Sequence, residues 1–254
     1  MEVEYEKQGP IAIITLNRPE ARNAVNGALA KRMEAVLDDY EADPELWAAI
    51  LTANGSAFCA GADLKEIAAG RGAELGTRKG GFAGLVNRKR TKPLIAAIAG
   101  SALAGGTEIA LACDMIICST ETVFGLPEVK RSLVAAAGGL FRLPRAIGMA
   151  PALEVIMTGD PLPAERAYQL GMVNKVVPAG EVMREAKALA TRVVAAAPVA
   201  VQQSRSVAIR AFTDDDDTLW RAGAQAFGEA AKTEDYKEGP RAFIEKRAPR
   251  WTGR

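Results

Sequence analysis

The chain has 254 residues, of which 49% are hydrophobic and 25% are charged. It is therefore long enough for one large α/β unit with an appended region, and its composition excludes a disordered or collagen-like protein. Its 32 basic and 31 acidic residues give a net charge of +1, which favours neither nucleic acid nor an anionic membrane as a partner. Histidine is absent, which excludes Ser-His-Asp and Cys-His relays and histidine metal ligands, and leaves acid–base chemistry to carboxylates, Lys, Tyr or Cys.

The first part of the chain alternates between strand and helix patterns. A β-branched apolar run at 11–16 predicts a buried strand, and the turn signal Asn-Arg-Pro follows it. From Asn23 to about Tyr40 apolar residues recur at helical spacing, with Asn23 as a possible cap. The further strands that we predict lie at 48–52, 93–98, 115–118 and 172–177. This alternation predicts an α/β fold with largely parallel strands joined by crossover helices.

Two regions depart from this alternation. Residues 70–81 are rich in glycine and basic residues, which predicts a mobile, polar insertion. Strand signals stop near residue 180, and helices are predicted at 181–197, 199–212, 218–231 and 234–246. The acidic run 214–217 fits a solvated cap on the next helix, and we assign it no function. The chain is thus expected to divide into a core, 1–195, and a helical C-terminal region, 196–254.

The cysteines and the hydropathy pattern bear on the cellular compartment. Cys59, Cys113 and Cys118 are odd in number and lack a C-x-x-C spacing, which argues against a disulfide framework or a thiolate zinc site. The acidic start at 1–6 lacks the plan of a signal peptide, and the longest apolar stretch, near 94–107, is short of a bilayer span. We therefore expect a cytoplasmic protein without a membrane partner.

The first segment with possible chemistry is Cys-Ala-Gly-Ala-Asp-Leu-Lys at 59–65. Its small residues would let backbone N–H groups approach a ligand, and Lys65 could meet an anion one turn later. The same residues also fit a tight turn in which Asp63 caps a short helix. Spacing alone leaves both interpretations open.

Two further segments each carry a glutamate. In 104–110 a Gly-Gly step at a helix start would expose unpaired N–H donors and place Glu108 in the first turn, where the helix dipole also favours a carboxylate. In 124–128 Glu128 follows a proline, as residues at a helix N-terminus often do. With histidine absent, two carboxylates in apolar surroundings could divide the roles of acid and base, because proximity and burial push their pKa values apart.

Together, in order and spacing, these segments resemble the crotonase, or enoyl-CoA hydratase/isomerase, family over nearly the whole chain. The other motifs that carry the resemblance lie at 17–19, 23–24, 92–97, 158–160, 171–174 and 237–247. The resemblance implies a superhelical core of repeated ββα units and a helical C-terminal part used in trimer formation, as a homotrimer or a dimer of trimers. It also implies an acyl-CoA thioester as the substrate, with coenzyme A as part of that substrate and no other cofactor or metal.

The resemblance also implies roles for particular residues. The backbone N–H groups of Ala62 and Gly105 would polarise the thioester carbonyl. Glu108 would orient and deprotonate a water molecule, and Glu128 would deliver a proton to the α-carbon. These roles imply the addition of water across the 2,3 double bond of a 2-enoyl-CoA.

Several residues are candidates for binding coenzyme A. Ala60 would meet the adenine through its backbone, Lys65 would lie on the path of the phosphates, and Phe243 and Lys246 would reach the ligand of a neighbouring subunit. Arg22 and the basic cluster 88–92 are candidates on charge alone, although a solvated helix end explains that cluster equally well. The remaining predicted substrate-binding residues are Gly61, Asp63 and Leu64.

The chain departs from typical hydratases after the second glutamate. Ala135, Ala136 and Ala137 stand where Pro-Gly-x is usual, and the added methyl groups would narrow the space for water and acyl chain. If Lys130 and Arg131 face Glu128, they would favour its ionised form. Other short motifs resemble the carnitinyl-CoA dehydratase branch. The alternatives are therefore a carnitinyl-CoA dehydratase-like lyase on a polar acyl-CoA and a non-catalytic acyl-CoA-binding protein.

Overall fold

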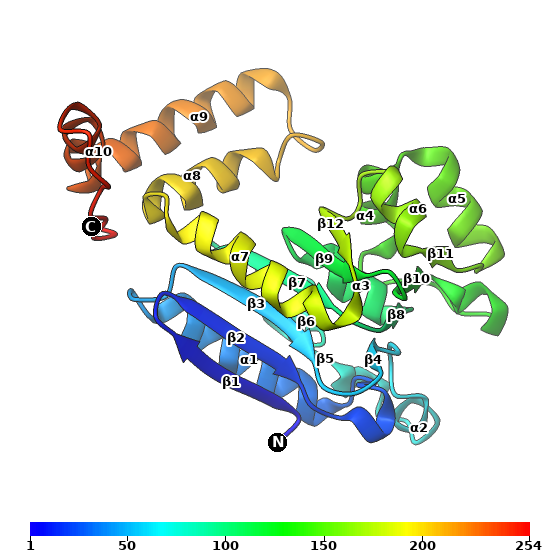
Figure 1. Ribbon diagram of the computed structural model, residues 1–254. Helices are drawn as coiled ribbons and strands as arrows, with labels where there is room; N and C mark the ends of the chain where they lie inside the picture. The colour runs from blue at the N-terminus through cyan, green and yellow to red at the C-terminus, as the bar shows by residue number, and fades with distance from the viewer.

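A six-stranded, largely parallel sheet organises the protein (Figure 1), and the computed structural model describes all 254 residues. The strand order is β1-β2-β3-β7-β9-β12, and only β1 runs antiparallel to its neighbour. The strands are β1 Val3–Gln8, β2 Ile11–Leu16, β3 Ala48–Ala53, β7 Leu94–Ile98, β9 Met115–Ser119 and β12 Lys175–Val177. The predicted parallel α/β architecture is confirmed. The sequence analysis missed β1, and it placed the start of β12 too early, because Met172 and Val173 are buried without being in a strand.

A second sheet has the order β11-β10-β8-β4, and β5 and β6 form a separate hairpin. These strands are two or three residues long: β4 Ala57–Cys59, β5 Gly76–Thr77, β6 Gly81–Phe82, β8 Ser101–Leu103, β10 Val123–Gly125 and β11 Leu162–Pro163. Segments this short carry no readable periodicity, so none of them was predicted. They matter because β4, β8 and β10 each lead directly into one of the three candidate segments.

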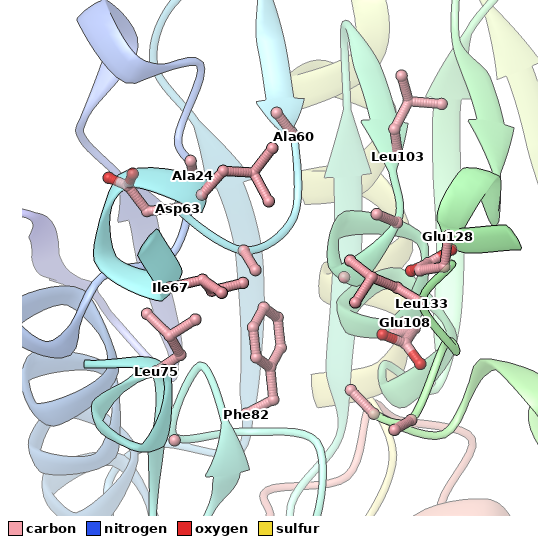
Figure 2. A pocket seen from close by; sticks show the side chains of 18 of the residues that line it. Ala24, Ala60, Asp63, Ile67, Leu75, Phe82, Leu103, Glu108, Glu128 and Leu133 are labelled. Atoms are coloured by element: carbon pink, nitrogen blue, oxygen red, sulfur yellow. The ribbon is translucent and has the colours of Figure 1, made fainter. Parts of the chain in front are cut away.

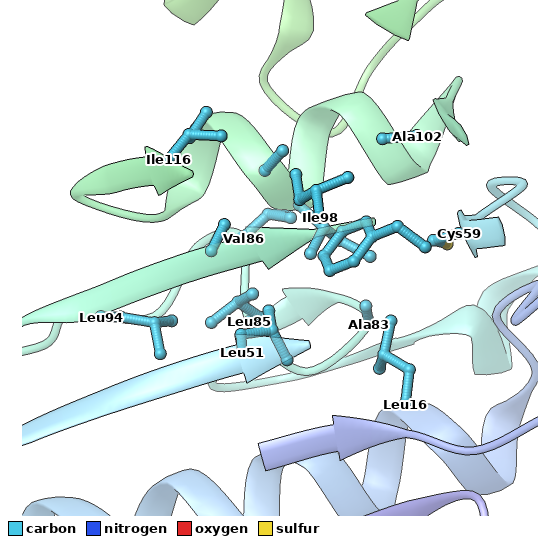
Figure 3. Packing of buried hydrophobic residues seen from close by; sticks show 14 of the residues in the cluster. Leu16, Leu51, Cys59, Ala83, Leu85, Val86, Leu94, Ile98, Ala102 and Ile116 are labelled. Carbon is cyan, nitrogen blue, oxygen red and sulfur yellow. The ribbon is translucent and has the colours of Figure 1, made fainter. Parts of the chain in front are cut away.

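The strands of the main sheet place alternate residues in two cores, as the two-residue period of a strand requires. Ile13, Ile50 and Ile95 lie on one face and pack against α7, Val182–Val194. Residues one position along, such as Leu51 and Leu94, belong to the larger core on the other face (Figure 3), which also contains buried residues of α1, Gly27–Ala42. The sheet is therefore covered on both faces, as parallel sheets usually are.

The remaining helices lie outside the main sheet, and the last two extend away from it (Figure 1). They are α2 Leu64–Ala68, α3 Gly105–Ala112, α4 Gly139–Ile147, α5 Met149–Thr158, α6 Ala164–Gln169, α8 Pro198–Ala208, α9 Asp216–Ala231 and α10 Asp235–Ile244. The short 3-10 helices are η1 Pro19–Ala21, η2 Gly72–Leu75, η3 Pro127–Arg131 and η4 Ala179–Glu181. The four predicted C-terminal helices are confirmed as α7 to α10, and Asp215 caps α9 by accepting from Thr218 N–H. No helix has the length and apolarity needed to span a membrane.

Asn23 does not cap α1, contrary to our prediction. The cap is Asn26, whose side chain accepts a hydrogen bond from Leu29 N–H. Asn23 is fully buried with a φ of 54°, and its amide donates to the carbonyls of Asn54 and Ala57 at 2.8 Å each. It therefore joins the turn after β2 to the start of β4.

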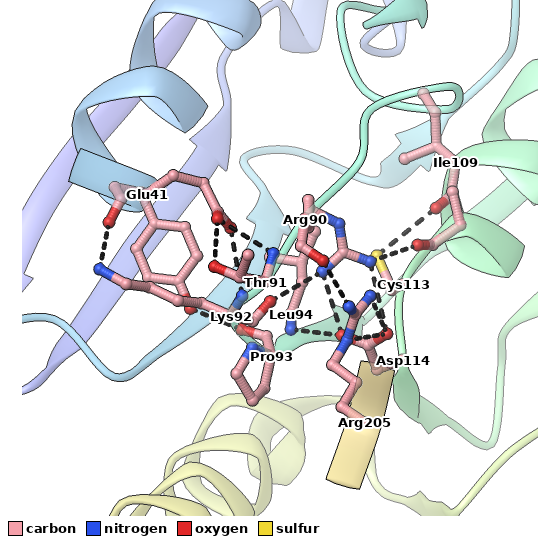
Figure 4. Close-up of polar contacts among 12 residues, drawn as sticks. Glu41, Arg90, Thr91, Lys92, Pro93, Leu94, Ile109, Cys113, Asp114 and Arg205 are labelled. Carbon is pink, nitrogen blue, oxygen red and sulfur yellow. Dashed lines mark hydrogen bonds and ion pairs between the residues drawn. The ribbon is translucent and has the colours of Figure 1, made fainter. Parts of the chain in front are cut away.

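A largely buried ion cluster connects the sheet to the C-terminal helices (Figure 4). Asp114, just before β9, lies 3.0 Å from Arg90 and 2.8 Å from Arg205 of α8. Arg205 also donates to the carbonyl of Arg90 at 2.6 Å. Because burial is costly for a lone charge, each of these groups depends on the others.

This cluster corrects our expectation for the basic residues at 88–92. Arg88 is buried and pairs with Asp38, and Arg90 is held by Asp114. The Lys92 ammonium donates to the carbonyls of Tyr40 and Asp43. These three side chains serve the fold and form neither a solvated helix end nor a phosphate site; only Lys89 is exposed.

The segment 70–81 contains regular structure that the sequence did not predict. Residues 72–77 form η2 and β5, and Leu75 is buried in the main core. Gly80 N–H donates to the carboxylate of Glu34 on α1 at 2.9 Å. The basic side chains of Arg71 and Lys79 pair with Glu66 and Asp38 respectively.

Candidate active site

One cavity of about 1060 Å³ gathers the three candidate segments. Its walls come from the turn after β2, α2 and η2 on one side, and from β8, the start of α3, η3 and residues 133–137 on the other. Figure 2 shows Ala60, Ile67 and Phe82 facing Leu133 and the two glutamates across it. The fold therefore brings together residues that are far apart in the sequence.

Two glycines let the first two segments touch. Gly61 has a φ of +94°, and a methyl group on it would lie 2.8 Å from Ala104 Cβ and 3.0 Å from the Gly105 nitrogen. A methyl group on Gly105 would lie 2.5 Å from the ring of Phe82. Since β4 and β8 are parallel neighbours, the loops that follow them leave the sheet side by side. Small residues at these positions are thus required by packing.

Two backbone donors line the cavity without a partner inside the protein. Gly105 is the first residue of α3, so no preceding helical turn supplies a carbonyl for its N–H. Ala62 N–H is also unpaired, while its neighbours are fixed by the Val25 N–H bond to Gly61 O and the Asp63 N–H bond to Val25 O. Such N–H groups are suited to a carbonyl oxygen that gains negative charge.

Glu108 is the more deeply buried of the two glutamates. It lies in the first turn of α3, is 3% exposed, and accepts a hydrogen bond from Gly139 N–H at 2.9 Å. Burial raises the pKa of Glu108, opposed by the backbone of Gly139 and Ala137 and by the charge of Arg142. Glu108 is therefore a carboxyl with an elevated pKa and one fixed donor.

Glu128 lies in the first turn of η3, directly after Pro127, and its Oε2 is buried without a hydrogen-bond partner. Burial raises the pKa of Glu128, and the charge of Glu108 raises it further, against a lowering by Arg131 and by its own backbone. Our expectation that Lys130 and Arg131 would favour the ionised form is thus outweighed by burial. Lys130 itself pairs with Asp160 at 2.7 Å.

Asp63 has two structural partners at the other end of the cavity. Its side chain caps α2 by accepting from Lys65 N–H at 3.1 Å, which confirms the interpretation of this segment as a capped short helix. It also pairs with Arg18 at 3.2 Å. Arg18 also lines the cavity. We predicted no role for it, because no sequence pattern links it to Asp63.

Most of the predicted site residues line this one cavity: Arg22, Ala60, Ala62, Asp63, Leu64, Lys65, Gly105, Glu108 and Glu128. Gly61 contributes through its contact with Ala104 and Gly105. Phe243 and Lys246 do not reach the cavity within one chain, because α10 lies at the opposite end of the molecule from α2 (Figure 1). The Phe243 side chain is 85% exposed.

The sequence analysis missed the apolar part of the lining. Ile67 and Phe82 contribute from one wall and Leu133 and Val134 from the other. Ala136 and Ala137, which we had expected beside the water and the acyl chain, also line the cavity. Val134 is 66% exposed and Leu133 is 44% exposed, which is unusual for aliphatic side chains beside buried carboxyls. Their spacing carried no periodic signal that could have identified them. No cluster of three or more Cys, Asp or Glu side chains is arranged to hold a metal ion.

The α/β fold and this cavity define a protein that can polarise a carbonyl group and exchange protons beside it. The family model described as enoyl-CoA hydratase/isomerase matches residues 6–254. The short-chain-enoyl-CoA hydratase of Clostridium acetobutylicum is 42% identical over 96% of this chain and 95% of its own length. The carnitinyl-CoA dehydratase of Salmonella typhi is 40% identical over 98% of this chain and 97% of its own length. The solved structure of an enoyl-CoA hydratase from Mycobacterium tuberculosis H37Rv superposes with a TM-score of 0.95 at 44% identity, covering 100% of this chain and 99% of that one.

The protein belongs to the enoyl-CoA hydratase/isomerase family, as the resemblance had predicted. The match to the solved structure also confirms the predicted crotonase-like fold.

Proposed function

We propose that the protein hydrates 2-enoyl-CoA thioesters. The observation that carries the proposal is the convergence on one cavity of two unpaired N–H donors and two desolvated carboxyl groups. Relatives named as enoyl-CoA hydratases support it, since three of them are 42%, 40% and 44% identical to this chain over almost its whole length. The reaction consumes only the thioester and water, so the proposal includes no metal and no redox cofactor.

In the proposed mechanism, the thioester oxygen accepts hydrogen bonds from Ala62 and Gly105. This withdraws electrons from the conjugated double bond and makes the β-carbon electrophilic. Water adds its oxygen to the β-carbon and gives a proton to Glu108, while Glu128 gives a proton to the α-carbon; a proton transfer through solvent restores both groups. Removing one such donor typically costs about 2.7–4 kcal/mol of transition-state stabilisation.

The environments of the two carboxyls support this division of roles. Glu108 accepts from Gly139 N–H and feels the positive charge of Arg142, both of which favour the carboxylate that a base requires. Glu128 has a buried oxygen without a donor and lies near a second carboxyl, both of which favour the protonated form that an acid requires. Because the two groups interact, their titration belongs to the pair.

We propose that coenzyme A lies along the turn at 59–65. Ala60, Gly61 and Leu64 would contact it through backbone and small or apolar side chains, and Asp63 would act by capping α2. Lys65 and Arg22 are exposed cations at this end of the cavity, which suits the phosphates of the coenzyme.

We also propose that residues 1–195 form the acyl-CoA-binding core and that 196–254 mediate assembly as a trimer or a dimer of trimers. The C-terminal region exposes large apolar side chains: Ile209, Phe212, Trp220, Phe227, Tyr236, Phe243 and Ile244. In such an assembly Phe243 and Lys246 would complete a neighbour's coenzyme site. The three free thiols suit the reducing cytoplasm that we propose as its compartment.

The test is an assay of the hydration of crotonyl-CoA and of medium-chain enoyl-CoAs, in which turnover is measured as the loss of enoyl-thioester absorbance. Glu128→Gln should abolish most turnover, whereas Glu121→Gln, at an exposed position, should leave it unchanged. No turnover on any enoyl-CoA, or equal activity of the two variants, contradicts the proposal. In that case tight thioester binding in calorimetry without product would identify a non-catalytic binder.

A second candidate function is dehydration or hydration of a carnitinyl thioester, favoured by the relatives named carnitinyl-CoA dehydratase. The lining near the glutamates consists of aliphatic side chains and Arg131. Aliphatic side chains suit an apolar acyl group, and the positive charge of Arg131 would repel a cationic one. Comparing kcat/KM for crotonyl-CoA and crotonobetainyl-CoA decides between the two.

A further inference from the structure

Arg142 is a half-buried cation on α4 without a carboxylate within ion-pair distance. Its guanidinium donates to the carbonyl of Val86 at 2.6 Å and to the carbonyl of Ala137 at 3.2 Å. It also stacks on the ring of Phe141, 5.1 Å from the centroid. A cation that is partly removed from water normally has an anionic partner, so this arrangement needs an explanation.

The two carbonyls that Arg142 binds belong to two different loops, one after β6 and one before α4. Val86 and Ala137 both line the cavity, and Gly139, two residues after Ala137, donates its N–H to Glu108. Arg142 thus connects the loop after β6 to the loop before α4. Loss of this connection would release the segment that carries the donor to Glu108.

The charge of Arg142 also acts on Glu108. Burial disfavours the cationic form of Arg142, and the charge of Glu108 is the largest influence in the opposite direction. The other groups that face Arg142 are Arg145 on α4, Arg90 and Cys113, and Glu108 in turn faces Glu128, which is influenced by Arg131. Among these groups, Glu108 is therefore the anion that most strongly favours the cationic form of Arg142.

We propose that Arg142 is a positioning residue for hydration, which clamps the Ala137–Gly139 segment onto Glu108 and acts on the Glu108 carboxylate as a positive charge beyond ion-pair distance. The inference rests on the proposed function, because it assigns Glu108 the role of base. It goes beyond that function by giving Glu108 a partner outside the reacting groups.

The chain offers a matched control. Arg145 lies on the same helix and stacks on the same Phe141 ring, also at 5.1 Å, but its side chain is exposed and makes no hydrogen bond. Arg145→Met therefore removes the same charge and the same stacking contact without touching the loop. Any effect that is specific to Arg142 must come from its clamp or its position beside Glu108.

The experiment measures the pH profile of kcat/KM for crotonyl-CoA in the wild type, Arg142→Met, Arg142→Lys and Arg145→Met. Arg142→Met should move the acid limb to higher pH, so its loss of kcat/KM relative to the wild type should be larger below that limb than at pH 8. Arg142→Lys should restore the limb because it restores the charge, and Arg145→Met should match the wild type. Equal profiles for Arg142→Met and Arg145→Met, or no restoration by lysine, overturn the proposal.

A second readout does not depend on turnover. Infrared difference spectra between acid and neutral pH should contain a protonated-carboxyl band that is missing in Glu108→Gln, and this band should appear at higher pH in Arg142→Met. An inactive wild type would refute the proposed function, while this band would still decide the role of Arg142. If Arg142→Met does not fold, Arg142→Gln removes the charge and retains a donor for one carbonyl; an unmoved band in that variant overturns the proposal.

Discussion

Glu108 and Glu128 lie on the same cavity, but only Glu108 accepts a hydrogen bond from a backbone N–H, that of Gly139 at 2.9 Å, while Oε2 of Glu128 has no partner. Chemically identical side chains are therefore placed in different surroundings by the elements that carry them, an α-helix start and a 3-10 turn. This difference is what allows one to act as base and the other as acid.

The pH dependence of hydration should reflect this pair. Burial raises the pKa of both glutamates, so the acid limb of kcat/KM should lie above about 4.3, the usual value for an exposed glutamate. Activity should fall at low pH as Glu108 becomes protonated and at high pH as Glu128 loses its proton. A pH–rate profile checks this; a rate that stays constant down to pH 4 would contradict it.

Gly61→Ala tests the contact between the two loops that carry the N–H donors. The new methyl group would lie 2.8 Å from Ala104 Cβ, so the loops must separate and activity should fall strongly. Gly70→Ala is the matched control, since Gly70 also has a positive φ of +77° but nothing lies within 4 Å of the added methyl. Both variants should lose about 1–2 kcal/mol of stability from backbone strain. Gly61→Ala should lose more because of the clash, and only Gly61→Ala should lose turnover. Equal activities in the two variants would refute the role of this contact.

Asp114→Asn should strongly destabilise the fold. It leaves Arg90 and Arg205 without their shared anion, which typically costs about 3–5 kcal/mol for a buried pair. Glu229→Gln, which breaks an exposed pair with Lys232, should change stability by less than about 1 kcal/mol. Urea unfolding of the two variants provides the comparison, and a similar midpoint for both would count against the buried cluster.

The same cluster should make stability depend on acid. Burial acts to raise the pKa of Asp114, but Arg90 and Arg205 outweigh it and the pKa is lowered. A group with a lowered pKa stabilises the fold fully above its unfolded value, about 3.9, and loses that contribution as the pH falls through its folded value. Unfolding free energies between pH 7 and pH 3 should therefore fall less steeply for Asp114→Asn than for the wild type. Parallel curves would exclude Asp114 as the source.

The thiols should resist alkylation in the native protein. Burial raises the pKa of Cys59, Cys113 and Cys118 to about 12 each, so very little thiolate exists at pH 8. Iodoacetamide followed by mass spectrometry should give unmodified native protein and three additions after denaturation. Rapid labelling of the folded chain would show that at least one thiol is accessible.

The sequence predicted the long elements well because they carry periodic signals. The apolar run 11–16 is β2 as predicted, and the four C-terminal helices lie close to their expected bounds. Errors occurred where one residue type serves two purposes. Asn23 resembled a helix cap, but its amide is used to hold β4, and Asn26 caps α1.

The candidate site was predicted in part. The family motifs gave the positions that line the cavity, but not the contacts that hold them there, such as Arg18 with Asp63 or Arg142 with the carbonyl of Val86. Each of these contacts joins residues that are distant in the sequence through a single polar group, so no local sequence pattern predicts them. The basic cluster at 88–92 misled for the same reason, because its charge is satisfied by Asp38 and Asp114 on other elements.

Leu133 and Val134 offer a practical route for protein engineering. Both side chains line the cavity and belong to neither core, with Leu133 44% and Val134 66% exposed, so replacing them should disturb neither the cores nor the two glutamates. A combinatorial library at these two positions is therefore the most economical way to retune which acyl tails the protein accepts.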